Sequence, residues 1–545
     1  DQHGTNLYDT DPDLARLLPL YLPEALVRHL QPQLHQLGAL AGGVLDTLAQ
    51  TADKNPPTLE HRTRTGVDAQ RIVKHPAYVE MERVAFSQYG LAAMSHRAGV
   101  LGWDAALPAA AKYALTYLFV QAEFGLCCPL SMTDSLTRTL RKYGDEKLVA
   151  KYLPKLLAMD FDSAVQGSMF MTEQAAGSDI SNTLTMAYPQ EDGSWRLYGE
   201  KWFCSNPDAG FGMVLARVEG GPPGMKGISL FLLPRQLDDG STNHYTIVRL
   251  KDKMGTRSMA SGEIRMEGAV AYLVGEQGRG FVQIADMVNN SRLSNGMRSA
   301  GMMRRAVAEA EYIARERWAF GKQLQDMPLM KVQLDKLRVP AEQARTMVFQ
   351  TAATLTRSDA GDPEAYALLR ILTPMIKFRA CRDARKVTGD AMEVRGGCGY
   401  IEEWADPRLV RDAHLGSIWE GTSNIVALDV KRAIKREGSL PVLQAYLHGL
   451  LKDTQGITAA YRQALTDALA GAVQLAERAV ADDGEYLVRQ AATALYNCTT
   501  AIAMAWEACK TGSQERLRLS QLVIAHRVLP RDPLHAGGVP AEWLQ

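Results

Sequence analysis

Apolar residues recur at every third or fourth position in two long parts of the chain. Residues 81–100 (MERVAFSQYGLAAMSHRAGV) and 109–128 (AAAKYALTYLFVQAEFGLCC) show this period and predict amphipathic helices between about residues 76 and 159. The period returns at residue 281 and continues through the C-terminal part, with no proline between residues 281 and 327. We expect Pro340 and Pro374 to kink or to start a helix.

The pattern is different between residues 165 and 270. Short runs rich in β-branched and aromatic residues alternate with Gly, Pro and Asp, as in GSWRLYGEKWFCS (193–205), GISLFLLPR (227–235) and SGEIRMEG (261–268). Such runs predict a meander of antiparallel strands, and hence a small β domain. The order of helices, strands and helices again predicts the α+β fold class.

Composition and charge exclude several classes of function. Apolar residues make up 46% of the chain and charged residues 22%, while Lys+Arg and Asp+Glu both number 61. A chain without net charge has no long-range field that would attract nucleic acid or an anionic membrane. Because no apolar run reaches the length of a membrane span, we expect neither secretion nor membrane insertion.

The spacing of cysteines and histidines adds little chemistry. The seven cysteines form no CxxC pair, which is typical of free thiols in a reducing cytoplasm, and the eleven histidines show no metal-binding spacing. The sequence contains no GxxxxGK[ST] loop, and no GxGxxG follows a strand-like run. We therefore expect a cytoplasmic protein with no metal site and no nucleotide on a Rossmann or Walker loop.

Five short segments combine residue types that suit a flat ligand carrying phosphates. In MFMTEQAAGSD (169–179) small residues let N–H groups cradle a phosphate, and GEKWFCSN (199–206) places an aromatic ring beside a hydroxyl. RERWAFGKQL (315–324) offers an arginine whose guanidinium can bind a phosphate or carboxylate through two hydrogen bonds. The glycines of EVRGGCGYIEE (393–403) allow the backbone to come close to a ligand, and SIWEGTSNIVALD (417–429) holds a single glutamate beside a tryptophan. Each segment alone also fits a structural explanation: a polar turn, core aromatic residues, a solvated helix end, a tight loop or an acid at a helix start.

The order of the segments is more specific than any one of them. MTEQAAGSD, GEKWFCS, LKDKMGTRS, VGEQGRGF, RWAFGK, RGGCGY and IWEGTSNI follow one another as in the acyl-CoA dehydrogenase family, which the chain resembles from about residue 76 to residue 433. NLYDTDPDLARLL, NPPTLEHR, HPAYVEM, CCPLSMT and GSIWEG further resemble the AidB branch of that family. That branch carries an extra C-terminal helical domain, as the periodicity of the last hundred residues also indicates.

The resemblance implies an acyl-CoA dehydrogenase-like fold of class α+β. Two helical domains would surround a β-barrel-like middle domain, with FAD in the cleft between them and against a neighbouring subunit. The expected divisions are an N-terminal extension (1–60), an N-terminal helical domain (61–164), the middle β domain (165–270), a helical bundle for FAD and substrate (271–436) and the extra C-terminal helical domain (437–545).

The resemblance also implies the residues that would contact FAD. Phe203 would stack on the isoalloxazine ring, and Arg317 and Phe320 would contact the dinucleotide of a partner subunit. Pro328 and Glu393 depart from the family, because relatives have glutamine at both positions. The expected FAD contacts are Met169, Met171, Thr172, Gly177, Ser178, Phe203, Ser205, Arg317, Phe320, Gly396, Gly397, Thr422 and Asn424.

The implied reaction is the FAD-dependent α,β-desaturation of an acyl-CoA thioester. Glu420 matches the base that removes the α-proton, while a β-hydride passes to flavin N5. Some branches place the base just before an arginine on the helix after the β domain, but Ser291 precedes Arg292 here, so Glu420 is the only base in a family position. The expected substrate contacts are Ser178, Asn289 and Arg292, with a structural arginine–carboxylate pair as the alternative for Arg292.

The implied partners are an acyl-CoA, an electron acceptor such as an electron-transfer flavoprotein, and further copies of the chain in a homotetramer built as a dimer of dimers. The implied setting is fatty acid metabolism in the cytoplasm. One alternative is a flavoprotein of the DNA alkylation response that binds DNA, but residues 441–545 hold nine Lys and Arg against ten acidic residues. The other alternative is flavin chemistry with oxygen, which relatives that often lack the glutamate carry out.

Overall fold

The computed structural model describes residues 1–534 and 538–544, which form two compact units. The chain enters each unit more than once, so neither unit is a single stretch of sequence. The barrel unit consists of Val44–Leu107 and Ala122–Ser291, and the helical unit consists of Asp1–Gly43, Pro108–Gln121 and Arg292–Gln545.

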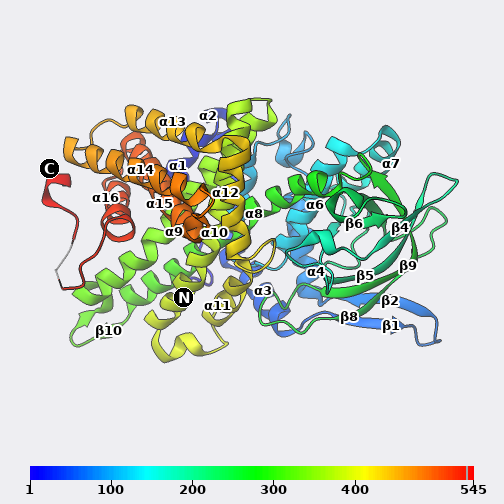
Figure 1. Cartoon of the computed structure of the whole chain (residues 1–545). Coiled ribbons are helices and arrows are strands. Elements are labelled where there is room, and N and C mark those ends of the chain that lie inside the picture. The colour runs from blue at the N-terminus through cyan, green and yellow to red at the C-terminus, as the bar shows by residue number, and fades with distance from the viewer. Residues whose placement is uncertain (535–537, 545) are drawn as a thin grey trace. The chain divides into compact units, whose positions relative to one another are not determined.

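Seven strands of the barrel unit form a closed sheet (Figure 1). They are β3 (Gly167–Phe170), β4 (Met186–Pro189), β5 (Trp195–Ser205), β6 (Phe211–Val218), β7 (Ile228–Pro234), β8 (Tyr245–Leu250) and β9 (Ser261–Val274). The hydrogen-bonded order is β3-β6-β4-β5-β9-β7, β7 returns to β6, and β8 pairs with β9. β3 and β4 run parallel to β6, and the other pairs are antiparallel. The predicted β domain is confirmed, and its closure removes the free edges of the paired circuit.

Hydrophobic side chains of the strands fill the barrel. Every residue of β7 is buried, and so are all residues of β6 except one. Leu197, Phe231 and Ile264 belong to the core cluster. In β5 the register shifts between Lys201 and Cys204, so a bulge interrupts the strict alternation of inward and outward residues. This bulge carries the two adjacent aromatic residues of the GEKWFCSN segment.

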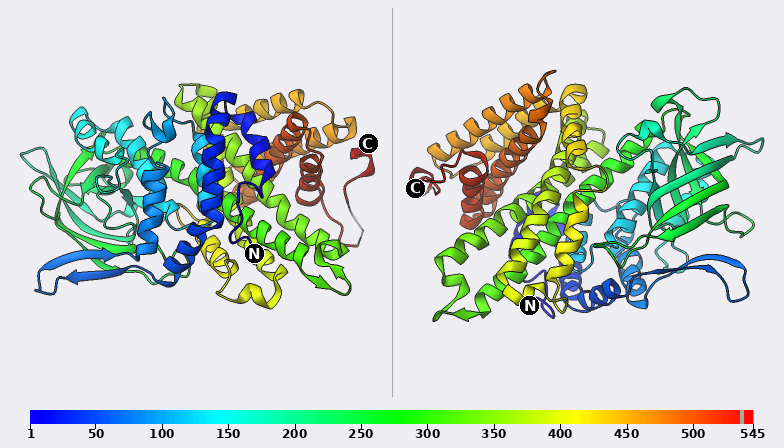
Figure 2. Two further views of the ribbon diagram at one scale, coloured as in Figure 1. Left: turned by 180° about the vertical axis from the view of Figure 1, so that it is seen from behind. Right: turned by 60° about the horizontal axis from the view of Figure 1, so that its bottom comes forward.

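A hairpin of the barrel unit lies outside the predicted elements. β1 (Thr58–Arg62) pairs with β2 (Asp68–Val73), and the hairpin lies beside β8 (Figures 1 and 2). Of its residues only Ile72 is buried. Gln70 anchors the hairpin, because its side-chain Oε1 accepts a hydrogen bond of 2.9 Å from the backbone N–H of Ile247.

Helices pack against the barrel within the same unit. They are α3 (Val44–Lys54), α4 (Pro76–Glu82), α6 (Cys127–Tyr143), α7 (Glu146–Leu156) and the first part of α8 (Gly280–Glu316). Asp134 on α6 is buried and accepts hydrogen bonds of 2.8 Å from His96 Nε2 and from Asn290 Nδ2. The bond from Asn290 joins α6 to the first part of α8, and the bond from His96 joins α6 to the turn that contains residue 96.

The helical unit contains long helices that lie against one another. They are α1 (Pro12–Tyr21), α2 (Glu24–Gly42), α5 (Ala109–Val120), the rest of α8, α9 (Pro328–Asp359), α10 (Pro363–Val394), α11 (Asp406–Gly416), α12 (Ser423–Glu437), α13 (Ser439–Asp453), α14 (Ala459–Val480), α15 (Val488–Thr511) and α16 (Gln514–Val523). The predicted return of helices after residue 281 is confirmed. Neither Pro340 nor Pro374 starts a helix, because they lie inside α9 and α10.

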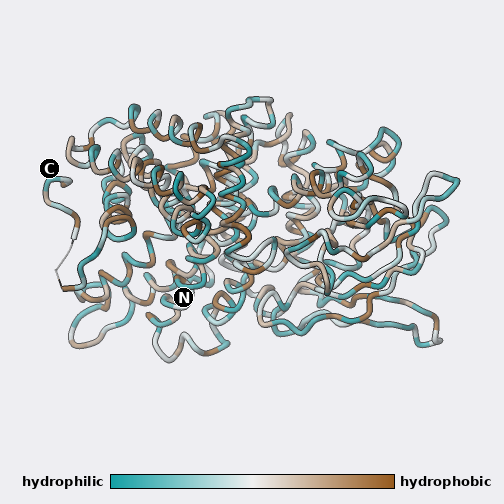
Figure 3. Tube along the Cα trace, viewed as in Figure 1, coloured by the Kyte–Doolittle hydropathy of each residue, from teal (hydrophilic) through white to brown (hydrophobic). Residues whose placement is uncertain are grey.

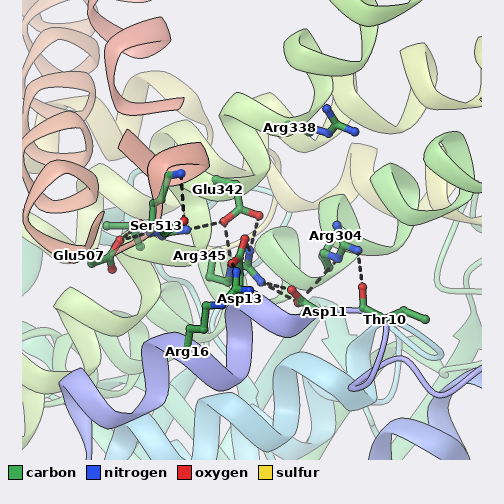
Figure 4. A network of polar contacts seen from close by, with 12 residues as sticks. Thr10, Asp11, Asp13, Arg16, Arg304, Arg338, Glu342, Arg345, Glu507 and Ser513 are labelled. Carbon is green, nitrogen blue, oxygen red and sulfur yellow. Dashed lines mark hydrogen bonds and ion pairs between the residues drawn. The ribbon is translucent and has the colours of Figure 1, made fainter. Parts of the chain in front are cut away.

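A buried ionic network joins the N-terminal segment to the C-terminal helices of this unit (Figure 4). Arg345 on α9 binds Asp11 Oδ2 at 2.7 Å and Glu342 Oε2 at 3.0 Å. Arg516 on α16 binds the same Glu342 oxygen at 2.7 Å and Glu507 Oε2 on α15 at 2.6 Å. Each of these side chains is at least nine-tenths buried, so every charge is compensated by a partner inside the protein.

Hydrophobic and hydrophilic residues interchange along the helices (Figure 3). Among the residues that the structure describes, no helix is long and apolar enough to span a membrane. The amphipathic period explains this pattern, since one face of each helix packs inward and the other meets solvent.

Candidate active site

The segment that carries Glu420 connects α11 to α12 in the helical unit. Glu420 has a φ of 58°, and Gly421 follows with a φ of 103°. A side chain with a Cβ rarely adopts this left-handed conformation, which costs about 1–2 kcal/mol. Such strain persists only where the surroundings impose it, and it gathers at functional sites. The glycine explains locally how the backbone can turn at this point.

Three side chains of neighbouring helices hold this segment by its carbonyl groups. Arg292 Nε donates to the carbonyl oxygen of Glu420 at 3.0 Å, and its Nη1 binds Asp429 at 2.8 Å. Asn295 Nδ2 donates to Gly416 O at 3.1 Å. Lys377 Nζ on α10 also donates to Gly416 O, and to Gly421 O at 3.4 Å. We call Arg292, Asn295 and Lys377 the carbonyl clamp, because together they fix the segment on both sides of Glu420.

Arg298 stands beside the carboxylate itself. Its Nη2 lies 3.7 Å from Glu420 Oε1, and its guanidinium lies 4.8 Å from the centre of the Trp419 ring. The Arg298 side chain is fully buried, and the Glu420 side chain is 8% exposed. Ser291, Asn295 and Arg298 follow one face of α8 at i, i+4 and i+7, which is the face toward the segment. The position at which other branches of the family place the base is therefore occupied here by a buried serine, Ser291.

Lys377 is a buried cation in a cationic environment. Burial lowers the pKa of Lys377, Glu420 opposes that shift, and the charges of Arg292 and Arg298 add to it. Sequence reasoning missed both Lys377 and Arg298. For Lys377 the available signal was a charged residue among the apolar residues of α10. Arg298 shares its face of α8 with the polar Ser291 and Asn295, so it gave no such signal.

The barrel unit brings together two of the predicted FAD segments. The backbone N–H of Trp202 donates to Thr172 O at 2.8 Å, and Lys201 Nζ lies 3.4 Å from Met171 O. The Phe203 side chain is 58% exposed, and the ammonium of Lys251 lies 4.6 Å from the centre of its ring. A flat aromatic residue thus remains largely open next to half-buried methionine and threonine side chains.

A buried ion pair that sequence reasoning missed supports these two segments. Lys201 Nζ binds Glu173 Oε1 at 2.7 Å, and Thr185 Oγ1 donates to the same oxygen at 2.6 Å. Burial alone would raise the pKa of Glu173, but Lys201 beside it brings that pKa below its usual value. Glu173 therefore anchors the loop between β3 and the exposed Gly177 and Ser178.

Two further predicted segments meet in the helical unit. Arg317 Nη1 donates to Arg395 O at 2.8 Å, directly before Gly396, whose φ is 70°. After Arg317 the two-residue strands β10 (Trp318–Ala319) and β11 (Lys322–Gln323) form a hairpin. Phe320 at its tip is 97% exposed. Thus Arg317 contacts the glycine loop, while Phe320 points away from the packed core.

The predicted site residues are divided between the two units. Three residues of the helical unit, Glu420, Thr422 and Asn424, lie close together in sequence, and Arg292 binds the carbonyl oxygen of Glu420. In the described part of the chain no group of three or more His, Cys, Asp and Glu side chains could hold a metal ion. The barrel unit carries Met169, Met171, Thr172, Gly177, Ser178, Phe203, Ser205 and Asn289, and the helical unit carries Arg292, Arg317, Phe320, Gly396, Gly397, Glu420, Thr422 and Asn424.

Known domains match most of the chain. The Adaptive response protein AidB N-terminal domain matches residues 1–163, the acyl-CoA dehydrogenase middle domain matches residues 168–269, and its C-terminal domain matches residues 278–435. Acyl-CoA dehydrogenase family member 11 of Caenorhabditis elegans is 32% identical over 462 residues, which are 83% of this chain and 74% of that protein. The chain belongs to the acyl-CoA dehydrogenase family.

Further relatives place this family member on the AidB-like branch. AidB of Escherichia coli (strain K12) is 34% identical over 404 residues, which are 72% of each chain. The solved structure of Caenorhabditis elegans ACDH-11 in complex with C11-CoA matches with a TM-score of 0.88 and 26% identity, covering 97% of this chain and 92% of that one. The predicted acyl-CoA dehydrogenase-like fold is confirmed, and the family membership makes the chain an oxidoreductase of the acyl-CoA dehydrogenase type.

Proposed function

We propose that this chain is an FAD-dependent acyl-CoA dehydrogenase that removes hydrogen from Cα and Cβ of an acyl-CoA thioester. The observation that carries the proposal is Glu420, a nearly buried carboxylate in a left-handed backbone conformation. The carbonyl clamp holds its backbone, and Arg298 stands next to its carboxylate. A fixed carboxylate of this kind suits a base that must meet a weakly acidic proton in one orientation.

The residues of the chain would divide the work between proton transfer and positioning. Glu420 would accept the α-proton of the thioester, and its backbone N–H is the donor expected to hold the charge that develops on the thioester oxygen. The clamp would keep that N–H and the carboxylate in a fixed relation. The positive charge of Arg298 would stabilise the negative charge of the Glu420 carboxylate before Glu420 accepts the α-proton.

The residues present fit FAD. In the barrel unit Phe203 offers an exposed flat ring, and no atom lies within 4 Å of the place where a Cβ on Gly177 would stand. In the helical unit Gly397 is equally open, and Arg317 stands beside Gly396. These are the features that a flat heterocycle and its diphosphate need. When bound, FAD supplies the acceptor for the β-hydride at flavin N5.

Substrate, acceptor and assembly follow from the family. An acyl-CoA is the proposed substrate, and C11-CoA is the first to try, because it is the ligand in the complex of the Caenorhabditis elegans relative. Ser178, Asn289 and Arg292 are the proposed substrate contacts. The contacts of Arg292 within the chain are with the Glu420 segment and with Asp429, as the structural alternative for this residue would have it. We also propose an electron-transfer flavoprotein as acceptor, a homotetramer, and a role in cytoplasmic fatty acid metabolism.

The C-terminal helices do not favour the alternative function in DNA binding. Several of their basic side chains pair with acids of the same unit: Arg518 binds Asp335 at 2.8 Å, Lys510 binds Asp453 at 2.8 Å, and Arg516 lies in the buried network. Arginines that are neutralised inside the protein release no counterions from DNA phosphates.

The test is an anaerobic titration of the purified protein with acyl-CoAs of increasing chain length. We expect a flavin absorption spectrum that loses its visible band when an acyl-CoA of the right length is added. An FAD-loaded protein whose spectrum no acyl-CoA changes would contradict the proposal.

A further inference from the structure

Three arginines converge on the segment from Ser417 to Asn424, outside the carbonyl clamp. Arg382 Nη1 on α10 donates to Ser423 Oγ at 3.1 Å, and Arg385 Nη1, one turn later, donates to Ser417 Oγ at 3.2 Å. Arg489 Nη1 on α15 donates to Asn424 Oδ1 at 3.2 Å. We call these three side chains the arginine cluster.

The charges of the arginine cluster are not neutralised by acids. Among the residues that the structure describes, no carboxylate oxygen lies within 4.0 Å of any of the three guanidinium groups. The acids nearby have other partners: Asp383 binds Arg527 at 2.8 Å, and Glu485 binds Lys431 at 3.0 Å. Each guanidinium bonds only to neutral oxygens in the contacts above, so folding gathers positive charge here without compensating it.

The positive field of the cluster acts on neighbouring groups. Burial lowers the pKa of Arg382, the charges of Arg489, Arg379 and Arg385 lower it further, and Asp383 opposes the shift. Burial also lowers the pKa of His414, and Arg385 adds to that shift. Burial is the larger cause of both shifts, and the arginine charges add a repulsion that a bound anion would relieve.

The surroundings of the cluster suit a phosphate with an attached aromatic group. The cluster lies at the first turn of α12, a helix of 15 residues whose N–H groups and dipole favour an anion. A groove of about 340 Å³ begins at the same place and is lined by Asn424, Ala427, Leu428, Glu485, Tyr486, Val488 and Arg489. The Tyr486 side chain is 80% exposed, so its ring is available for stacking.

We propose that Arg382, Arg385 and Arg489 bind the phosphates of an adenosine diphosphate group. This group is common to FAD and to coenzyme A, and naming these two sources rests on the proposed function. One guanidinium group can donate two parallel hydrogen bonds to two oxygens of a phosphate. Three guanidinium groups can neutralise the two or more negative charges of a diphosphate. The hydroxyl groups of Ser417 and Ser423 orient two of the three guanidinium groups, those of Arg385 and Arg382.

Single replacements on the full chain test the cluster. Arg382→Gln, Arg385→Gln and Arg489→Gln each remove one charge and keep a polar side chain, and Lys386→Gln is the matched control on α10, because Lys386 is exposed and pairs with Asp390. The dissociation constants of FAD and of coenzyme A are measured separately by calorimetry. For at least one of the two ligands we expect each arginine variant to bind about tenfold more weakly, with the control unchanged.

The two arms identify the source of the diphosphate. Weaker binding of FAD alone assigns the cluster to the cofactor, and weaker binding of coenzyme A alone assigns it to the substrate. If the wild-type chain binds both ligands and all three variants bind both equally well, the proposal is wrong. Circular dichroism of each variant shows whether it is folded.

A measurement on the wild-type chain separates this proposal from the proposed function. Phenylglyoxal modifies accessible arginines, and mass spectrometry locates the modified residues. We expect inorganic pyrophosphate to protect the three cluster arginines and to leave the exposed Arg16 unprotected. If pyrophosphate protects the three arginines but the chain binds neither FAD nor coenzyme A, the anion site is supported and the proposed function is wrong. Absence of protection would overturn the site.

Discussion

At the scale of single residues, the proposed proton transfer depends on a strained glutamate held by its neighbours. Glu420 and Gly421 both have positive φ values, and the carbonyl clamp fixes the oxygens of the surrounding segment. The resemblance of the IWEGTSNI motif could predict Glu420 but not what holds it. Lys377 and Arg298 act through tertiary contacts with residues far away in sequence, so no local pattern indicates their partners.

The strain at Glu420 predicts an unusual order of stability among its variants. Glu420→Gly should be more stable to denaturant than Glu420→Ala by about 1 kcal/mol, because glycine adopts a positive φ without a clash of its Cβ. Both variants lack the carboxylate, so their comparison isolates the backbone. Equal stability, or a more stable alanine variant, would show that the left-handed conformation is not imposed on this position.

Lys377 predicts a loss of rate without a loss of cofactor. Lys377→Met keeps the length of the side chain but removes the donor to Gly416 O and Gly421 O. The free energy of unfolding should fall by about 1–3 kcal/mol, and kcat should fall more than KM rises, because the base loses its fixed position.

Steady-state kinetics and FAD content measure this prediction. Lys386→Met on the exposed face of the same helix is the control. A Lys377→Met variant that loses stability but keeps its kcat would assign Lys377 a purely structural role.

At the scale of elements, the ionic network of Figure 4 ties the N-terminal segment to α9, α15 and α16. Burial alone would raise the pKa of Glu342, but Arg345 and Arg516 hold that pKa at about 2. A glutamate in an unfolded chain has a pKa of about 4.3. Ionised Glu342 therefore contributes stability above about pH 4, and this contribution is lost as the pH falls toward about 2.

Glu342→Gln should remove part of the acid sensitivity of the fold. At neutral pH the variant should be less stable by about 3–5 kcal/mol, because two buried guanidinium groups lose a partner. Between pH 5 and pH 3 its stability should fall less steeply than that of the wild type. Denaturant unfolding at several pH values measures both effects, and Glu515→Gln, at a half-exposed pair with Arg518, is the control. Equal slopes for wild type and Glu342→Gln would contradict the assignment.

The elements differ in how far the sequence could predict them. The strands of the barrel bury alternating or continuous apolar residues, and so their pattern was readable. The β1–β2 hairpin buries only Ile72 and gains its register from Gln70, so hydrophobic alternation carries no signal there. We expect Pro340 and Pro374 to start or to kink a helix; neither starts one, because each lies inside a long helix, and the kink stays a prediction.

At the scale of the whole molecule, two exposed aromatic residues test the proposed assembly. Phe320 and Trp318 on the β10–β11 hairpin are 97% and 66% exposed. Large apolar side chains at a hairpin tip are costly in water unless something covers them. The family resemblance predicts that a second copy of the chain does so and receives a cofactor contact in return.

Phe320→Ser should weaken both assembly and FAD retention. If the proposed tetramer forms, sedimentation velocity should show a shift of the variant to smaller species, and the variant should lose more FAD than the wild type during gel filtration. Leu184→Ser, which also removes an exposed apolar residue but in the barrel unit, should change neither. If the assembly state and the FAD content of the variant equal those of the wild type, Phe320 is not part of an interface between subunits.

The most direct test of the central claim is the rate at which an acyl-CoA reduces the bound flavin in a single anaerobic turnover. Glu420→Gln should keep its FAD but react about 10²–10⁴-fold more slowly than the wild type, because the amide cannot take the α-proton. Glu402→Gln, at an exposed glutamate of the same unit, should react at the wild-type rate. A Glu420→Gln variant that reduces its flavin as fast as the wild type would show that Glu420 is not the base.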